Sequence, residues 1–373
     1  MVRTFPRPLV KLRKTLRVSI LTPYLTPAVC GLLDHSRHLG HELIRRGGTV
    51  QLLGLYGEEG EIDTQVLPEK RIAMWGVERG SLNAAIAEAE LDWLIVQLSS
   101  YGYSRWGAPW GLGRILYKLK QGNRVRLAAI VHETHCMPAQ LGWKGPILSL
   151  WQRYTVSSLL HCCDMIFPTV DIWLEQCLCD YRLPKDRVCL LPIAANVQSV
   201  ILTSSERESL REALGILPNS KVAAIFGRWD SQKLALRRLS TEVRRALLER
   251  KIEHIISIGG DGPNPPKDLW SELGGKEFNG RLHILGPQPV NMVGKYLSIC
   301  DIGLVSAPLR MWKKSGAARA YEQAYLELWI ADDSNNRMEI VHPDGSFPTW
   351  EETAEILWKK LAIGLPGGMS PLP

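Results

Sequence analysis

Short apolar runs alternate with amphipathic segments along the first half of the chain. The run at residues 91–98 is predominantly apolar, which is typical of a strand covered on both faces of a parallel sheet. Similar runs predict strands at 18–21, 49–56, 126–133, 163–170 and 187–193, with helical patterns at 32–46, 81–90, 114–121, 148–161 and 171–178. This alternation is typical of α/β proteins and predicts a doubly wound parallel sheet with helices on both faces.

The same alternation resumes after a polar stretch at residues 194–219. It predicts strands at 221–228, 254–260, 281–286 and 301–308, helices at 204–216, 240–250 and 292–299, and a closing amphipathic helix from residue 350. We therefore expect two Rossmann-like α/β domains. The predicted divisions are a basic tail at 1–16, an N-terminal domain at 17–200, a C-terminal domain at 201–349, and a helix with a tail at 350–373.

Composition narrows the class of protein. The 373 residues suit two domains, and 45% hydrophobic with 22% charged residues is an ordinary globular balance. No run approaches the ~18 apolar residues that a membrane span needs. The eight cysteines are irregularly spaced, so we expect reduced thiols, not a disulfide framework, and a cytoplasmic location.

The formal net charge is +7, and the first 17 residues carry basic side chains and no acidic one. Such a tail is typically solvated. One alternative is peripheral contact with an anionic membrane at its inner face, and a second is contact with nucleic acid. We expect no nucleic-acid partner.

Lys314, Ser315 and Gly316 follow an apolar run at residues 302–305 and precede small residues suited to a helix start. The backbone N–H groups at a helix N-terminus are unpaired, and the helix dipole places partial positive charge there. Gly316 lets a ligand approach closely, and Lys314 adds a full charge. The segment therefore predicts a cradle for a phosphate or diphosphate. The alternative is an ordinary strand-to-helix turn with a surface lysine.

Two such domains imply a cleft lined by loops at the carboxyl ends of the strands. Side chains suited to anion binding or proton transfer follow several predicted strands: Asp34, His132, Glu133, Arg228, Lys233 and Gly260. Each of three residues also has a purely structural alternative. Arg228 could pair with an acidic residue, Lys233 could be solvated, and Gly260 could only form a turn. His35, His38 and His41 drift around a helix instead of sharing one face, so we expect no metal site.

Several blocks resemble nucleotide-sugar glycosyltransferases of the GT-B fold, in the glycosyl transferase group 1 (glycogen synthase-like) set. The opening segment TPYLTPAVCGLLDHSRHLGHELIRRGGTVQLL is similar to the first strand, glycine loop and helix of that family. The segments RLAAIVHETH and FGRWDSQK resemble a cleft-lining strand end and the loop that offers Arg and Lys to a diphosphate. The segment from Ile284 to Ala318 resembles the donor-binding core.

The resemblance implies a hexosyltransferase that moves a sugar from a nucleotide-diphosphate donor to a glycan, lipid or small-molecule acceptor without a metal or other cofactor. The donor would bind the C-terminal domain and the acceptor the N-terminal domain. Gly31, Gly260, Ser315 and Gly316 would approach the donor, and Arg228, Lys233 and Lys314 would stabilise its leaving diphosphate. His132 would lie near the transferred sugar, with Glu133 beside it. The resemblance favours retention over inversion of the anomeric centre; with inversion, Asp34 would be the base.

The chain departs from the family near the donor-binding core, where Tyr325-Leu326-Glu327-Leu328 also replaces the usual Gly-(Leu/Thr)-Pro-Val segment. The family often carries two glutamates seven residues apart near the donor, the second binding the ribose, and Trp312 and Ala320 stand there in this chain. Glu322 comes two residues late and would face another side of the helix. The departure keeps open an alternative in which the protein is a catalytically degenerate GT-B-like binding or scaffold subunit.

Overall fold

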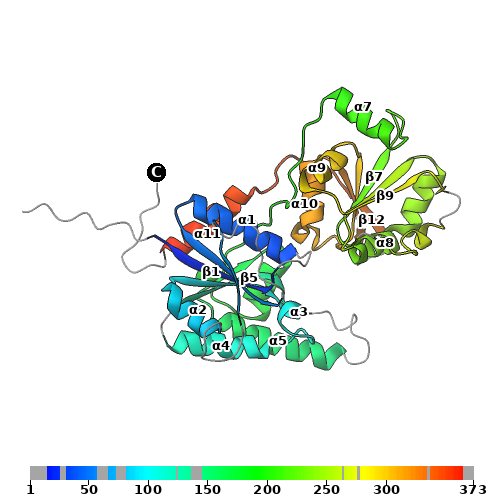
Figure 1. The fold of residues 1–373 in the computed structure, drawn as a ribbon. Helices are drawn as coiled ribbons and strands as arrows, with labels where there is room; N and C mark the ends of the chain where they lie inside the picture. The colour runs from blue at the N-terminus through cyan, green and yellow to red at the C-terminus, as the bar shows by residue number, and fades with distance from the viewer. Residues whose placement is uncertain are drawn as a thin grey trace, which may run out of the picture.

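The computed structural model describes residues 15–25, 31–56, 66–72, 81–122, 125–135, 145–262, 264–274, 278–333 and 337–363. The predicted basic tail lies almost wholly outside the described residues. The chain forms two α/β domains, each built on one six-stranded sheet (Figure 1). Among the described helices, none has the length and apolar character needed to cross a membrane.

The N-terminal sheet has the strand order β3-β2-β1-β4-β5-β6, and every neighbouring pair is parallel. Helices α1 and α11 cover one face, and α2, α4 and α5 cover the other (Figure 1). The strands are β1 (Arg17–Tyr24), β2 (Thr49–Tyr56), β3 (Glu69–Arg71), β4 (Trp93–Ser99), β5 (Arg126–Glu133) and β6 (Met165–Pro168). The helices are α1 (Gly31–Arg45), α2 (Leu82–Ala89), α3 (Ser100–Tyr103), α4 (Trp110–Gln121), α5 (Gly145–Cys162), α6 (Asp171–Glu175) and α11 (Trp350–Ile363).

The predicted strand at residues 187–193 is wrong. Only an isolated bridge joins Val188 to Ile166 of β6, although the amides of Cys189 and Leu191 donate to the carbonyls of Ile166 and Pro168. Pro168 has no N–H to donate in return, so the ladder of hydrogen bonds cannot continue.

The C-terminal sheet has the order β12-β11-β10-β7-β8-β9 and is parallel except for the pair β11–β12. Its strands are β7 (Val222–Phe226), β8 (His254–Ile258), β9 (Leu282–Gly286), β10 (Ile302–Val305), β11 (Glu327–Asp332) and β12 (Arg337–Val341). Its helices are α7 (Ser204–Ala213), α8 (Trp229–Leu248), α9 (Val290–Ser298) and α10 (Gly316–Gln323). The last two strands were not predicted, and α8 begins well before the predicted residue 240. The predicted class, two doubly wound Rossmann-like domains, is confirmed.

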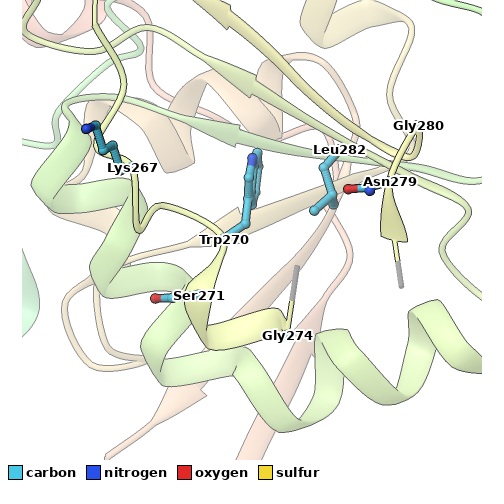
Figure 2. A pocket seen from close by; sticks show the side chains of 7 residues that line it. All are labelled: Lys267, Trp270, Ser271, Gly274, Asn279, Gly280 and Leu282. Atoms are coloured by element: carbon cyan, nitrogen blue, oxygen red, sulfur yellow. The ribbon is translucent and has the colours of Figure 1, made fainter. Parts of the chain in front are cut away.

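A hollow of about 530 Å³ lies on the C-terminal domain beside Trp270 and Leu282 (Figure 2). Leu282 is the first residue of β9, so this hollow lies at the amino edge of the sheet. Open α/β sheets bind ligands at the opposite, carboxyl edge. This hollow is therefore not at the edge where a ligand is expected.

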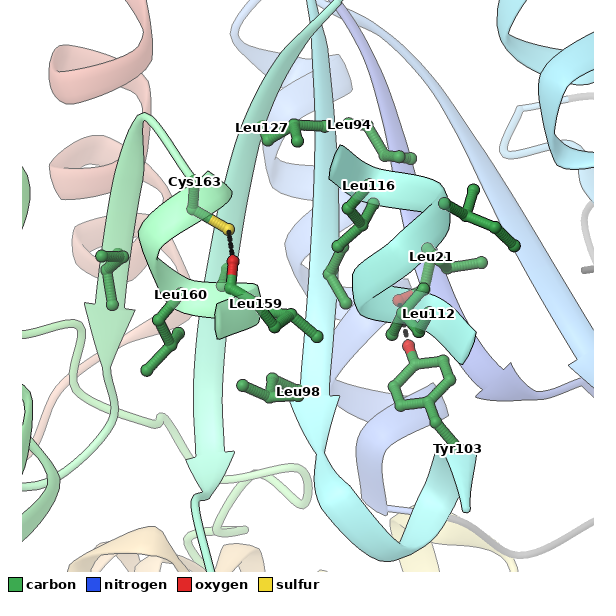
Figure 3. Close-up of a cluster of buried hydrophobic side chains, with 14 of the residues drawn as sticks. Leu21, Leu94, Leu98, Tyr103, Leu112, Leu116, Leu127, Leu159, Leu160 and Cys163 are labelled. Atoms are coloured by element: carbon green, nitrogen blue, oxygen red, sulfur yellow. Dashed lines mark hydrogen bonds between the residues drawn. The ribbon is translucent and has the colours of Figure 1, made fainter. Parts of the chain in front are cut away.

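The single sheet of the N-terminal domain has a separate apolar cluster packed on each of its two faces. Figure 3 shows part of the cluster under α4 and α5, to which Leu112 and Leu116 of α4 and Leu159 and Leu160 of α5 belong. The hydroxyl of Tyr103 donates to the carbonyl of Leu21, 2.9 Å away, and so ties α3 to β1. Burial of such side chains stabilises the domain by roughly 25 cal/mol per Å² of apolar surface removed from water.

Candidate functional site

A cleft of about 660 Å³ lies between the two domains at the carboxyl edges of both sheets. Both sheets change winding direction there, between β1 and β4 and between β7 and β10, and ligands bind at such switch points. The cleft brings together eight predicted site residues: Gly31, Asp34, His132, Glu133, Arg228, Gly260, Lys314 and Gly316. Lys233 and Ser315 are not among its lining residues.

Two helix N-termini open into the cleft. Gly31 begins α1, and a Cβ built on it would meet no atom of the described residues within 4 Å, so these residues leave room for a ligand at the backbone. Gly316 begins α10. Ser315 caps α10 by accepting from the amide of Ala318 at 3.3 Å, which leaves the first two N–H groups of the helix for a ligand.

Lys314 joins the two domains across the cleft. Its ammonium lies 2.8 Å from the Glu133 carboxylate and 5.8 Å from the centre of the Trp173 ring. Both partners belong to the N-terminal domain, at the end of β5 and in α6. The Ser99 hydroxyl also donates to Glu133, at 3.3 Å. An anion that entered the cleft would therefore compete with Glu133 for the lysine charge.

Arg228 lies in the cleft and is paired with an acid, as the alternative from the sequence foresaw. Its guanidinium is 3.0 Å from Asp261, and this hydrogen bond lowers the pKa of the Asp261 carboxyl. Arg228 remains about half exposed, so a ligand can reach it. Lys233 instead donates to Asp268 at 2.6 Å, outside the cleft lining, and its role in diphosphate binding stays a prediction.

Three glycines bring the loops after β7 and β8 into contact. Gly227, Gly259 and Gly260 all have positive φ angles, of 127°, 96° and 119°, which strain other residues. A Cβ on Gly260 would approach the Trp229 ring to 2.2 Å, and one on Gly259 would approach the carbonyl of Gly227 to 2.9 Å. Glycine is therefore required here for close backbone packing at the cleft wall.

His132 belongs to a buried polar chain. The Gln97 oxygen lies 2.7 Å from Nε2 of His132, and the Gln97 nitrogen lies 3.1 Å from Nδ1 of His35. Because the amide oxygen only accepts and the amide nitrogen only donates, both imidazoles carry their proton on Nε2. Nδ1 of His132 is then an acceptor. Nε2 of His35 is a buried donor with no partner among the described residues.

Both imidazoles are neutral at pH 7. Burial, with a smaller contribution from the Lys314 charge, lowers the pKa of His132 to about 3. Burial also holds the pKa of His35 well below its usual range. Asp34 shifts the other way: burial raises its pKa, opposed by Arg37 and by a hydrogen bond from Asn196. A raised pKa makes this carboxylate a stronger base than an exposed aspartate.

Sequence reasoning missed three residues at the site. Gln97 is a polar residue inside an otherwise apolar strand, and a polar residue at such a position indicates a buried hydrogen-bond partner. Trp350, the first residue of α11, stacks on His38 with ring centres 4.9 Å apart. The Asn196 side-chain oxygen is buried without a partner among the described residues, next to the space where a Cβ of Gly316 would be. No local pattern marks the last two.

The positions where the family carries glutamates are filled by buried side chains. Trp312 and Ala320 are both buried in the core of the C-terminal domain. Glu322 is also buried and forms an ion pair with Arg319 at 2.6 Å, so it is not a cleft residue. Among the described residues, no group of three or more His, Cys, Asp or Glu side chains is arranged to hold a metal.

No family model and no curated protein matches the sequence. Several solved structures match the fold. Sucrose-phosphate synthase from Thermosynechococcus elongatus is 12% identical, covers 84% of this chain and 80% of its own, and has a TM-score of 0.60. HepE from Anabaena, in complex with UDP-glucose, is 13% identical, covers 92% and 88%, and has a TM-score of 0.58.

A putative UDP-N-acetylglucosamine 2-epimerase from Listeria monocytogenes also matches, at 10% identity, 93% and 88% coverage and a TM-score of 0.53. At these identities the likeness shows the shared two-domain GT-B fold. A shared fold does not specify an activity, which depends on the side chains of the cleft.

Proposed function

We propose that the protein is a glycosyltransferase that uses a nucleotide-diphosphate sugar and binds its diphosphate between α1 and α10. One observation carries the proposal: the N-termini of α1 and α10 and the side chains of Lys314 and Arg228 line a single cleft. Unpaired N–H groups, helix dipoles and fixed cations are the features that bind phosphate. The fold shared with HepE, a structure containing UDP-glucose, supports a nucleotide sugar as the ligand.

In the proposed reaction, the bond between the anomeric carbon and the diphosphate oxygen breaks, and its electron pair leaves on the diphosphate. The acceptor hydroxyl oxygen forms a bond to the same carbon, and with retention its proton passes to an oxygen of the leaving diphosphate. Lys314, Arg228 and the α10 N-terminus would stabilise the charge on the leaving group, without a metal. The Lys314–Glu133 pair would open as the diphosphate takes the lysine.

The neutral imidazole of His132 would position the sugar. Its Nδ1 would accept a hydrogen bond from a sugar hydroxyl, and the Gln97 amide would hold the ring in that tautomer. Asp34 would be the proton acceptor if the reaction inverts the anomeric centre, because its raised pKa strengthens it as a base. We propose retention as the expected outcome, and product stereochemistry would test it.

A donor screen tests the proposal. Titration calorimetry with UDP-, GDP- and ADP-sugars should show binding of at least one of them, with slow release of free sugar or transfer to an added acceptor. Arg228→Ala should weaken that binding about tenfold or more, since a charge-assisted contact is lost. Arg237→Ala is the matched control, because Arg237 lies on the exposed side of α8, paired with Glu272.

One observation favours a second candidate. No carboxylate stands at the usual ribose-binding position, which Ala320 occupies. The chain would then be a binding or scaffold subunit with the GT-B fold and no turnover. Binding of a nucleotide sugar without product formation would favour it, whereas turnover abolished by Arg228→Ala would reject it.

A further inference from the structure

The outer side of α4 and α5 carries four of the eight large aromatic side chains that are exposed in the described part of the chain. We define the α4–α5 face by Trp110 and Tyr117 of α4 and by Ile147, Leu150, Trp151 and Tyr154 of α5. Their exposed fractions run from 44% for Trp151 to 78% for Ile147. Trp106, just before α4, is 52% exposed and extends the face. Large exposed apolar patches of this kind mark binding surfaces.

The exposed residues follow helical spacing on both helices. Trp110 and Tyr117 stand opposite the buried Leu112 and Leu116 on α4. On α5, Leu150 and Tyr154 stand opposite the buried Val156 and Leu159. The two helices pack side by side on the sheet face that is turned away from α1 and α11 (Figure 1). The aromatic rows therefore form one continuous surface.

Hydrogen bonds connect the two ends of this surface. The buried side-chain nitrogen of Gln152 on α5 donates to the carbonyl of Trp106, 2.7 Å away, and to the hydroxyl of Tyr101, 2.9 Å away. These bonds fix the loop before α4 against α5. The loop follows α3, which begins directly after the carboxyl end of β4. The face thus reaches the edge of the sheet where the cleft opens.

This part of the chain carries far more basic than acidic residues. Between Asp92 and Asp164 the only acidic residue is Glu133, and it is paired with Lys314 in the cleft. Lys120 and Arg153 have partners in Asp164 and Asp180. Among the described residues, no carboxylate lies within ion-pair distance of the three remaining cations of this surface, Arg105, Arg114 and Lys118. Arg105 and Arg114 lie over the rings of Trp106 and Trp110.

We propose that the α4–α5 face binds an anionic lipid bilayer. Trp and Tyr favour the boundary between water and acyl chains, and aliphatic side chains insert just beneath it. Arg and Lys beside them meet the phosphate headgroups of anionic lipids. A second copy of this chain would bring the same unbalanced cations together, so charge disfavours self-pairing. Docking there would hold the cleft edge next to the membrane, where a lipid-borne acceptor is found.

Co-sedimentation of the full chain with vesicles tests the proposal. Binding should be strong with mixed phosphatidylcholine and phosphatidylglycerol, weak with phosphatidylcholine alone, and should fall with salt. Tryptophan fluorescence should shift to the blue on binding. Leu150→Ser with Tyr154→Ser should lower the partition coefficient about tenfold or more, because two inserted side chains are lost.

A closely matched control exists in the C-terminal domain. Leu217 and Tyr325 are 70% and 67% exposed, and Leu150 and Tyr154 are both 70% exposed. Leu217→Ser with Tyr325→Ser should leave vesicle binding unchanged. Replacing the basic residues of the first 14 positions with glutamine separates the tail from the face, because the fluorescence shift should survive. Thermal unfolding of each variant verifies the fold.

Three outcomes would overturn the proposal. The first is equal sedimentation with and without anionic vesicles. The second is binding that the tail substitutions abolish and the Leu150 and Tyr154 substitutions do not change. The third is self-association in ultracentrifugation that these two substitutions abolish, with no binding to vesicles.

Discussion

His132, Gln97 and His35 are connected by hydrogen bonds in the N-terminal domain, and each side chain depends on the next. The amide of Gln97 sets the tautomer of both rings, and burial keeps both rings neutral. A neutral imidazole with an unprotonated Nδ1 accepts hydrogen bonds from neutral hydroxyl groups, such as those of a sugar. At the residue scale, the proposed chemistry of the cleft depends on keeping both histidines in their neutral form.

The buried histidines predict how stability depends on pH. The pKa of His132 is about 3 in the folded state and near 6.5 when unfolded, so the unfolded chain binds the extra proton between these values. The free energy of unfolding should therefore fall as the pH drops below about 6.5, by up to ~1.4 kcal/mol per pH unit for each such histidine. Urea unfolding of the wild type and His132→Gln from pH 7 to pH 5 measures the slope. An unchanged slope in the variant would contradict the assignment.

Helix α11 ends the described chain but belongs to the first domain. Ala354, Leu357 and Leu361 are buried in the same cluster as Leu39 and Leu43 of α1. The Thr353 hydroxyl donates to the carbonyl of Pro192 at 3.0 Å. The helix also brings Trp350 to the cleft, where its indole N–H donates to Ala195 at 2.7 Å. At the element scale, α11 therefore completes both the apolar core of the N-terminal domain and the wall of the cleft.

Leu357→Ala tests this role. Removing a fully buried leucine side chain leaves a cavity and should cost about 2–5 kcal/mol of unfolding free energy. The loss should appear in the unfolding of the N-terminal domain, although the residue lies near the end of the sequence. Ile363→Ala on the same helix is the control, because Ile363 is 75% exposed and should change stability by about 0.5 kcal/mol or less. Equal effects of the two substitutions would contradict the packing of α11.

At the scale of the whole molecule, the two similar α/β domains contact each other across the cleft. Lys314 of the C-terminal domain reaches Glu133 and Trp173 of the N-terminal domain, so the cleft is bridged by an ion pair at the position proposed for a diphosphate. Such a pair between partly exposed groups is weak in water. Lys314 can therefore exchange the Glu133 carboxylate for a phosphate at a small cost in free energy. Binding of the proposed diphosphate would then be coupled to the contact between the domains.

Glu133→Gln tests this coupling. Removing the competing carboxylate should free Lys314, and the affinity for UDP should rise several-fold. Turnover should fall if Glu133 also acts on the bound substrate, so calorimetry and product formation are measured separately. Glu272→Gln, on the outer side of the C-terminal domain and paired with Arg237, controls for the general loss of a negative charge. Unchanged or weaker UDP binding in Glu133→Gln would contradict the competition.

Much of the fold and part of the site could be predicted from local pattern. The carboxyl ends of strands in a parallel sheet share one edge. The sequence therefore predicts that three side chains at the ends of predicted strands face one cleft: His132, Glu133 and Arg228. All three line the cleft in the structure. Lys233 was placed by the same reasoning, but its long side chain turns to Asp268. Lys233 lies on α8 and Asp268 on a loop far along the chain, and no local sequence pattern predicts that the two are close.

By itself, the sequence determined the alternation of strands and helices, the two-domain class and the loops that meet at the carboxyl edges, because these follow from local periodicity and chain direction. Only the tertiary structure decided which charges are paired across the cleft, that Gln97 holds two imidazoles, that α11 closes the first domain, and that α4 and α5 leave an aromatic face uncovered. These features depend on residues that lie far apart in the chain and meet only when the chain has folded.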